Sequence, residues 1–91
     1  MKIVVMCGVG VGTSGILKVN AERALERLDI EARVVATDVA GVRAEAADAQ
    51  VILTSSELVS AIGKTNADVI VILNYFDVDE LALKLDVALG S

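Results

Sequence analysis

A single cysteine stands at the mouth of a glycine-rich stretch and is the residue best suited to do chemistry. The stretch reads Cys7-Gly8-Val9-Gly10-Val11-Gly12-Thr13-Ser14, and it lies between an apolar run and a helical pattern. Its alternating glycines keep Cβ atoms away and let successive backbone N–H groups turn toward one point. A helix that begins there adds its free N–H groups and the positive end of its dipole.

This arrangement predicts a cradle for an anion, above all for phosphate, with a thiolate beside it. Positive potential favours the ionised thiol and lowers its pKa from about 8.5 into a range of roughly 3.5 to 7.5. We therefore predict that Cys7 is a nucleophile that carries a phosphoryl group. The predicted phosphate-binding residues are Gly8, Val9, Gly10, Val11, Gly12, Thr13 and Ser14.

Three other interpretations of the stretch stay open. The cysteine could be an inert buried side chain. The chain could instead be a dinucleotide-binding fold. The segment from Gly10 to Gly15 matches its motif G-x-G-x-x-G, and Asp38 follows the second expected strand, where a residue that binds the ribose would stand. A small cysteine phosphatase also has a thiolate after its first strand, but it needs an arginine six residues later, where this chain has Thr13.

A phosphocarrier role would account both for the residues that the glycine-rich stretch contains and for the arginine that it lacks. It must accept phosphate, protect it from water and pass it on. An arginine in the loop would stabilise the charge that develops during hydrolysis, and the stretch holds none. The nucleotide-triphosphate loop G-x-x-x-x-G-K-[ST] is absent from the chain.

Composition excludes several classes of function. The 91 residues suffice for one domain, which we expect to span residues 1–91. One cysteine and no histidine argue against a disulfide or a metal site, and any phosphohistidine must belong to a partner. A net charge of −5 argues against binding to nucleic acid or anionic lipid. Without a signal peptide or an apolar run long enough to span a bilayer, the expected location is cytoplasmic.

Hydrophobic periodicity predicts alternating strands and helices. Continuous apolar runs predict strands over 2–6, 32–37, 50–54 and 68–73. Helices are expected over 14–28, 42–48, 55–62 and from 77 onward. Ser55 or Ser56 is expected to cap the third helix, Gly63 to end it, and Asp77 with Glu80 to form a capping box at the last.

Such an order predicts an α/β fold: a four-stranded parallel sheet with helices on both faces and the phosphate-binding loop after the first strand. Ligands of these sheets bind at the carboxyl ends of the strands, where the strand order reverses. If the first strand is central, Cys7 lies at that point. Thr54 ends the third strand nearby, and Asp38 is expected to shape a turn. Tyr75 is expected to face a partner, and Phe76 either to face a partner or to pack in the core.

The motif Cys7-Gly8-x-Gly10-x-Gly12-Thr13-Ser14 resembles the active-site loop of enzyme IIB components of the bacterial phosphoenolpyruvate-dependent sugar phosphotransferase system. It is most similar to the ascorbate and galactitol branch. IIB proteins of the lactose and cellobiose type share the fold but usually have serine or alanine where Gly8 and Gly10 stand. The galactitol type tends to have alanine at the position of Gly12, so the glycine favours the ascorbate type.

This resemblance implies that Cys7 accepts phosphate from a phosphohistidine on a IIA partner. It also implies that Cys7 then gives the phosphate to a sugar held by the membrane permease IIC. No cofactor, nucleic acid or membrane insertion is implied. The alternatives are a small phosphatase-like enzyme and a regulatory domain that binds phosphate or a nucleotide without transport.

Overall fold

Strand β1 (Lys2–Met6) is the strand around which the sheet is built. Its residues Ile3 to Met6 are all fully buried, as expected of a strand covered on both faces. The computed structural model describes residues 1–6 and 13–89, except for the side chains of Thr13 and Ser14. In this part β1 pairs in parallel with β2 (Arg33–Thr37) on one side and with β3 (Val51–Thr54) on the other.

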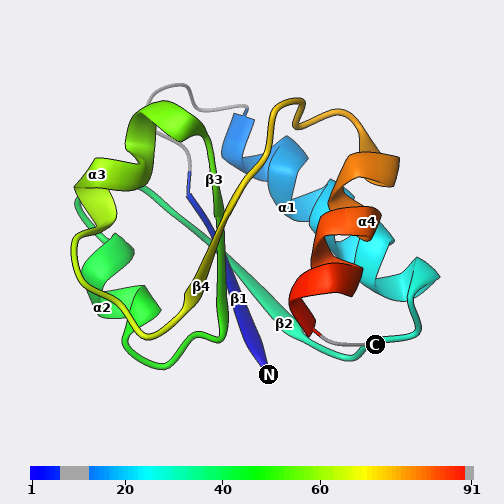
Figure 1. Ribbon diagram of the computed structural model, residues 1–91, viewed down its shortest axis with the longest axis horizontal. Coiled ribbons are helices and arrows are strands. Elements are labelled where there is room, and N and C mark those ends of the chain that lie inside the picture. Colours follow the sequence, from blue (N-terminus) through cyan, green and yellow to red (C-terminus); the bar gives the residue numbers. More distant parts are fainter. Residues whose placement is uncertain (7–12, 90–91) are drawn as a thin grey trace.

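Strand β4 (Asp68–Val71) completes the parallel sheet beside β3, which gives the order β2-β1-β3-β4 (Figure 1). The chain leaves β1 to form β2 on one side and then returns to form β3 on the other. The order therefore reverses at the carboxyl ends of β1 and β3. The prediction that the first strand is central is confirmed.

Helices cover both faces of the sheet (Figure 1). Helices α1 (Thr13–Arg27) and α4 (Val78–Leu89) lie on one face. Helix α2 (Val42–Ala46), the 3₁₀ turn η1 (Ser56–Leu58) and helix α3 (Val59–Ile62) lie on the other. The predicted α/β class, with a four-stranded parallel sheet, is confirmed. No helix in 1–6 and 13–89 is both long and apolar enough to cross a membrane.

Alternation along the strands divides the core into two clusters. Ile3 and Val5 pack toward α1 and α4, whereas Val4 and Met6 pack toward α2 and α3. The apolar stripe predicted for the first helix is confirmed as the buried face of α1. Its members are Leu17, Ala21, Ala24 and Leu25, with Leu28 packed against the same cluster.

The turn after α1 is stabilised by backbone hydrogen bonds that close the helix. The N–H of Ile30 donates to the carbonyl of Leu25 at 2.9 Å, and the N–H of Asp29 donates to that of Glu26 at 3.1 Å. Asp29 has a φ of 57°, the left-handed conformation usual after a helix that ends in this way. Gly63, at the end of α3, has a φ of 72°, so the predicted glycine stop is confirmed as well.

The predicted serine cap and one of the two bonds of the predicted capping box are not observed. Ser55 stands at the N-cap position of η1, but its side chain makes no capping hydrogen bond there. Asp77 caps α4 as predicted, because its Oδ1 accepts from the N–H of Glu80 at 3.2 Å. The return bond of a capping box does not form, since the Glu80 carboxylate binds the N–H groups of Leu73 and Asn74 instead. The fourth strand accordingly ends at Val71 rather than at Leu73.

Candidate functional site

The carboxyl edge of the sheet is where the fold brings together the elements expected to form the site. Strand β1 ends at Met6 and α1 begins at Thr13. The predicted nucleophile and most of the predicted cradle, Cys7, Gly8, Val9, Gly10, Val11 and Gly12, lie outside the described residues. Thr13 and Ser14 are the first two residues of α1. The N-terminus of a 15-residue helix thus stands at the end of the predicted loop.

Strand β3 brings a buried polar residue to the same edge. Val5 of β1 pairs with Leu53 of β3, so Thr54 lies level with Met6, the last residue of β1. The Thr54 side chain is fully buried, and its hydroxyl has no hydrogen-bond partner within residues 1–6 and 13–89. The carboxyl edge therefore contains an unsatisfied hydroxyl beside the strand that leads into Cys7.

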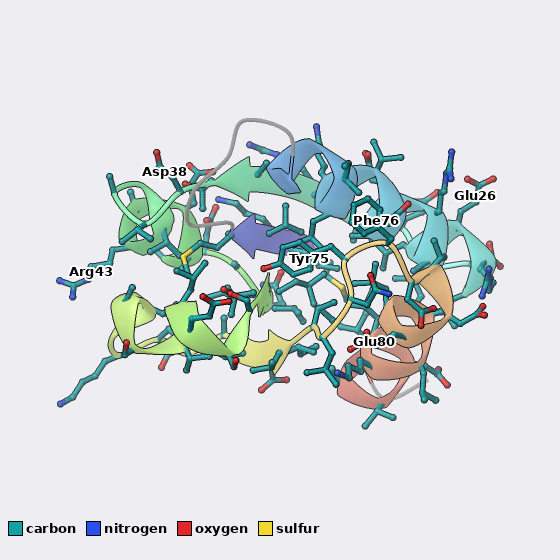
Figure 2. All side chains as sticks on the ribbon, turned by 90° about the horizontal axis from the view of Figure 1, so that it is seen from above. Glu26, Asp38, Arg43, Tyr75, Phe76 and Glu80 are labelled. Atoms are coloured by element: carbon teal, nitrogen blue, oxygen red, sulfur yellow. The ribbon has the colours of Figure 1, made fainter. Side chains whose placement is uncertain are left out.

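The turn after β2 is held by Asp38. Its Oδ1 accepts from the N–H of Gly41 at 2.9 Å, which confirms the predicted turn role. A Cβ at Gly41 would stand 2.5 Å from the Thr37 Oγ1, so any larger residue there would force the Thr37 side chain to move. Figure 2, which looks onto the sheet from the end where the strands finish, shows Asp38 on the opposite side of the molecule from Glu80.

The connection from β4 to α4 forms the other flank of this edge. Asn20, on the buried side of α1, donates from its Nδ2 to the carbonyl of Tyr75 at 2.8 Å and so ties the connection to α1. Within the connection, the N–H of Phe76 donates to the Asn74 side chain at 3.0 Å. Figure 2 shows Tyr75 and Phe76 near α1. The sequence analysis did not single out Asn20. The signal that could have found it is its place as a polar residue among the apolar positions of the helix.

Phe76 forms part of a groove at the start of α1 rather than part of the core. Phe76 is 68% exposed, so of the two predicted alternatives the exposed position is observed and core packing is not. Tyr75 is half-buried and packs against the cluster beneath α1 and α4. The groove is lined by Gly15, Ile16, Val19, Asn20, Arg23 and Phe76.

The Glu80 carboxylate holds the start of the connection between β4 and α4 in place. It accepts from the N–H groups of Leu73 at 2.7 Å and Asn74 at 2.9 Å, and from the Lys84 ammonium at 2.6 Å. Lys84 also donates to the carbonyl of Val71 at 2.7 Å. Burial raises the pKa of Glu80, but the hydrogen bonds from Lys84 and the two N–H groups outweigh it and hold the pKa below its ordinary 4.5.

Glu80→Gln should therefore weaken the protein at neutral pH and change its response to acid. A folded-state pKa below the unfolded one adds stability above about pH 4.5, and this stability is lost as the pH falls through the lower value. We expect the variant to lose about 1–3 kcal/mol at pH 7, the usual contribution of hydrogen bonds to a charged group. Urea titrations between pH 3 and 7 should show that the free energy of unfolding falls less steeply with decreasing pH in the variant than in the wild type. Glu57→Gln, at an exposed glutamate of η1, is the matched control; equal slopes for the wild type and Glu80→Gln would contradict the assignment.

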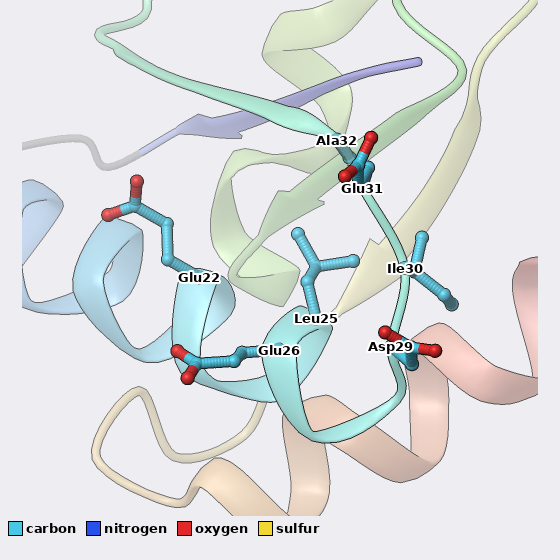
Figure 3. Close-up of a pocket in the computed structure, with 7 residues that line it drawn as sticks. All are labelled: Glu22, Leu25, Glu26, Asp29, Ile30, Glu31 and Ala32. Atoms are coloured by element: carbon cyan, nitrogen blue, oxygen red, sulfur yellow. The ribbon is translucent and has the colours of Figure 1, made fainter.

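A second hollow lies at the far end of α1 and is not part of this site (Figure 3). Four of its lining residues are acidic: Glu22, Glu26, Asp29 and Glu31. Figure 3 shows their carboxylates pointing in different directions rather than toward one centre. No group of acidic, cysteine or histidine side chains within the described residues could hold a metal ion.

These features define an open parallel α/β domain whose candidate site lies where strand order reverses, at the start of a helix. Comparison with protein families gives a more specific result. Residues 2–86 match the family model described as "PTS system, Lactose/Cellobiose specific IIB subunit", so the chain belongs to this family of phosphotransferase-system IIB subunits. No curated protein matches the chain.

Family membership implies a phosphocarrier role in sugar uptake and, in general terms, IIA and IIC partners. It confirms the prediction of an enzyme IIB component. It does not support the ascorbate and galactitol branch that the loop glycines predict, because the matched family is the one specific for lactose and cellobiose.

Proposed function

We propose that Cys7 accepts a phosphoryl group from a phosphohistidine on a IIA partner and passes it to a sugar bound by a IIC permease. The observation that supports this most strongly is the match of nearly the whole chain to the IIB family, together with the place of β1. Cys7 directly follows the central strand, at the edge where sheets of this kind bind ligands. On this proposal residues 1–91 act as one cytoplasmic domain.

The chemistry requires two displacements at phosphorus. In the first, the Cys7 thiolate attacks the phosphohistidine, so that an S–P bond forms and the N–P bond breaks. In the second, a sugar hydroxyl attacks the same phosphorus, so that an O–P bond forms and the S–P bond breaks; the hydroxyl proton passes to water, and Cys7 leaves as the thiolate. Between the two steps the N-terminus of α1 and the predicted cradle, Gly8 to Ser14, stabilise the negative charge of the phosphoryl group.

The loop glycines and the matched family favour different sugars. Gly8, Gly10 and Gly12 favour an ascorbate-type substrate, with a galactitol-type substrate next. The matched family instead favours a disaccharide such as lactose or cellobiose. Uptake assays with each sugar, in cells that supply IIA and IIC components of each type, distinguish these substrates.

Labelling with phosphoenolpyruvate tests the proposal directly. With the general phosphotransfer proteins and a IIA partner present, the chain should take up labelled phosphate, and iodine should release the label because it attacks thiophosphates. Rapid loss of label to water would instead indicate a phosphatase. Stable label that never reaches a sugar in the presence of IIC would indicate a regulatory domain.

A further inference from the structure

Strand β4 lies at an edge of the sheet and directs backbone groups outward. In the described part of the chain its one neighbour is β3, at the end of the order β2-β1-β3-β4. The N–H groups of Asp68 and Ile72 donate to carbonyl groups on the β3 side, at 2.9 and 2.8 Å. Because alternate residues of a strand face the same neighbour, the N–H and carbonyl groups of Val69 and Val71 face away from the sheet. An edge of this kind is a template for another strand.

The fold covers this edge only in part. Lys84 of α4 reaches it, since its ammonium donates to the outward carbonyl of Val71 at 2.7 Å. That oxygen has two lone pairs and can accept from a second donor. The N–H of Val71 and both backbone groups of Val69 stay open within residues 1–6 and 13–89. The segment Val69 to Val71 is also uncharged and β-branched throughout, so it is well suited to pair with a further strand.

Helix α4 presents apolar side chains beside the same edge. Leu83 and Val87 lie one helical turn apart and are 66% and 76% exposed. Val87 is also one turn from Lys84, the residue that reaches β4. The buried Leu81 and Leu85 occupy the opposite side of the helix. Figure 2 shows α4 and β4 at one border of the molecule, opposite β2. An open strand edge and an exposed apolar helix side therefore form one surface.

We propose that a second copy of this chain binds this surface and forms a twofold dimer with one continuous sheet. The two β4 strands run antiparallel and are centred on Ile70, which places Val69 opposite Val71 of the second copy. These are the residues whose backbone groups face outward, so each strand supplies the donors and acceptors that the other needs. The twofold axis is perpendicular to the sheet, so both α4 helices lie on one face and their apolar sides meet across the axis.

Charge complementarity favours a second copy as the occupant. The carboxylate of Asp68 is exposed and forms no ion pair within the described residues. Strand alternation places it on the same face as Ile70 and Ile72, the face that α4 covers. In the antiparallel pair Asp68 stands opposite Ile72 of the second copy, next to the Val71 carbonyl that holds Lys84. Two symmetric pairs of Asp68 with Lys84 then join the copies, so the surface is complementary to itself.

This dimer leaves both candidate sites accessible. The two β4 strands run in opposite directions, so the carboxyl edges of the two sheets point to opposite ends of the dimer. The groove at the start of α1 lies at its own carboxyl edge and takes no part in the contact. Dimerisation and any activity of the candidate site are therefore separate properties of the chain.

Sedimentation velocity over a concentration series tests the proposal. The average mass of the wild type should rise from that of one chain toward that of two. Val69→Pro removes an N–H that points away from β3, so it should fold but lose a donor of the interface. Leu83→Lys keeps a good helix former and places a charge where the two α4 helices meet. Each change should weaken association about tenfold or more.

Val39→Lys is the matched control for the introduced charge. Val39 is also an exposed apolar residue, but it follows β2 at the other edge of the sheet, so this variant should associate like the wild type. Circular dichroism checks that each variant folds, and Leu83→Lys alone suffices if Val69→Pro does not. A wild type that stays a single chain up to about 1 mM would overturn the proposal. So would a dimer that persists in Leu83→Lys, or one that Val39→Lys weakens equally.

Discussion

Cys7→Ser should take up no measurable phosphate from a phosphorylated IIA partner. A serine hydroxyl is almost entirely protonated at neutral pH, and the chain has no histidine that could activate it. We expect a loss of about 10⁴-fold or more, the scale seen when an enzyme loses its nucleophile. The measurement is the initial rate of labelling with phosphoenolpyruvate and the general phosphotransfer proteins.

The fold of this variant should be intact, which makes the loss interpretable. The residues that form the two core clusters in the described part of the chain are all unchanged in this variant. Thermal unfolding followed by circular dichroism should therefore give nearly the wild-type midpoint. Full labelling of a folded Cys7→Ser variant would show that another residue carries the phosphate.

Leu85→Ala should cause a large loss of stability. The Leu85 side chain is fully buried between α4 and the sheet, in the cluster that contains Leu17 and Val5. Removing three carbons from a closely packed core leaves a cavity and typically costs about 2–5 kcal/mol. Urea unfolding should show this as a lower midpoint with an unchanged slope.

Leu83→Ala is the matched control for this prediction. It makes the same change in the same helix, but the Leu83 side chain is 66% exposed. We expect its free energy of unfolding to stay within about 0.5 kcal/mol of the wild type. Equal losses from the two variants would mean that α4 does not pack on the sheet as described.

The sequence predicted the strands and helices well because their signals are local. The run Ile3 to Met6 is apolar throughout, as a strand covered on both faces must be, and Leu17, Ala21 and Leu25 repeat at the helical period. From these patterns the order of elements and the parallel sheet follow. The expected first strand, residues 2–6, has the same bounds as β1.

The parts that were missed depend on contacts between distant residues. Leu73 continues an apolar run and therefore resembled the end of a strand, but its N–H binds the Glu80 carboxylate and its side chain is 82% exposed. The spacing of Asp77 and Glu80 indicated a capping box, yet nothing local shows that the β4 end competes for that carboxylate. The buried state of Thr54 likewise follows from the packing of the sheet rather than from its neighbours in sequence.

The central place of β1 has a consequence for the order in which the protein can assemble during synthesis. A parallel pair cannot be closed by a tight hairpin, so each neighbour of β1 must come from a distant part of the chain. A nascent chain that has not yet released Val51 to Thr54 can cover only one edge of β1 and lacks the Thr54 hydroxyl altogether. More than half of the polypeptide must therefore leave the ribosome before the carboxyl edge that holds the candidate site can form. A truncated product that stops before β3 would contain the cysteine but only one of the two strands that flank β1.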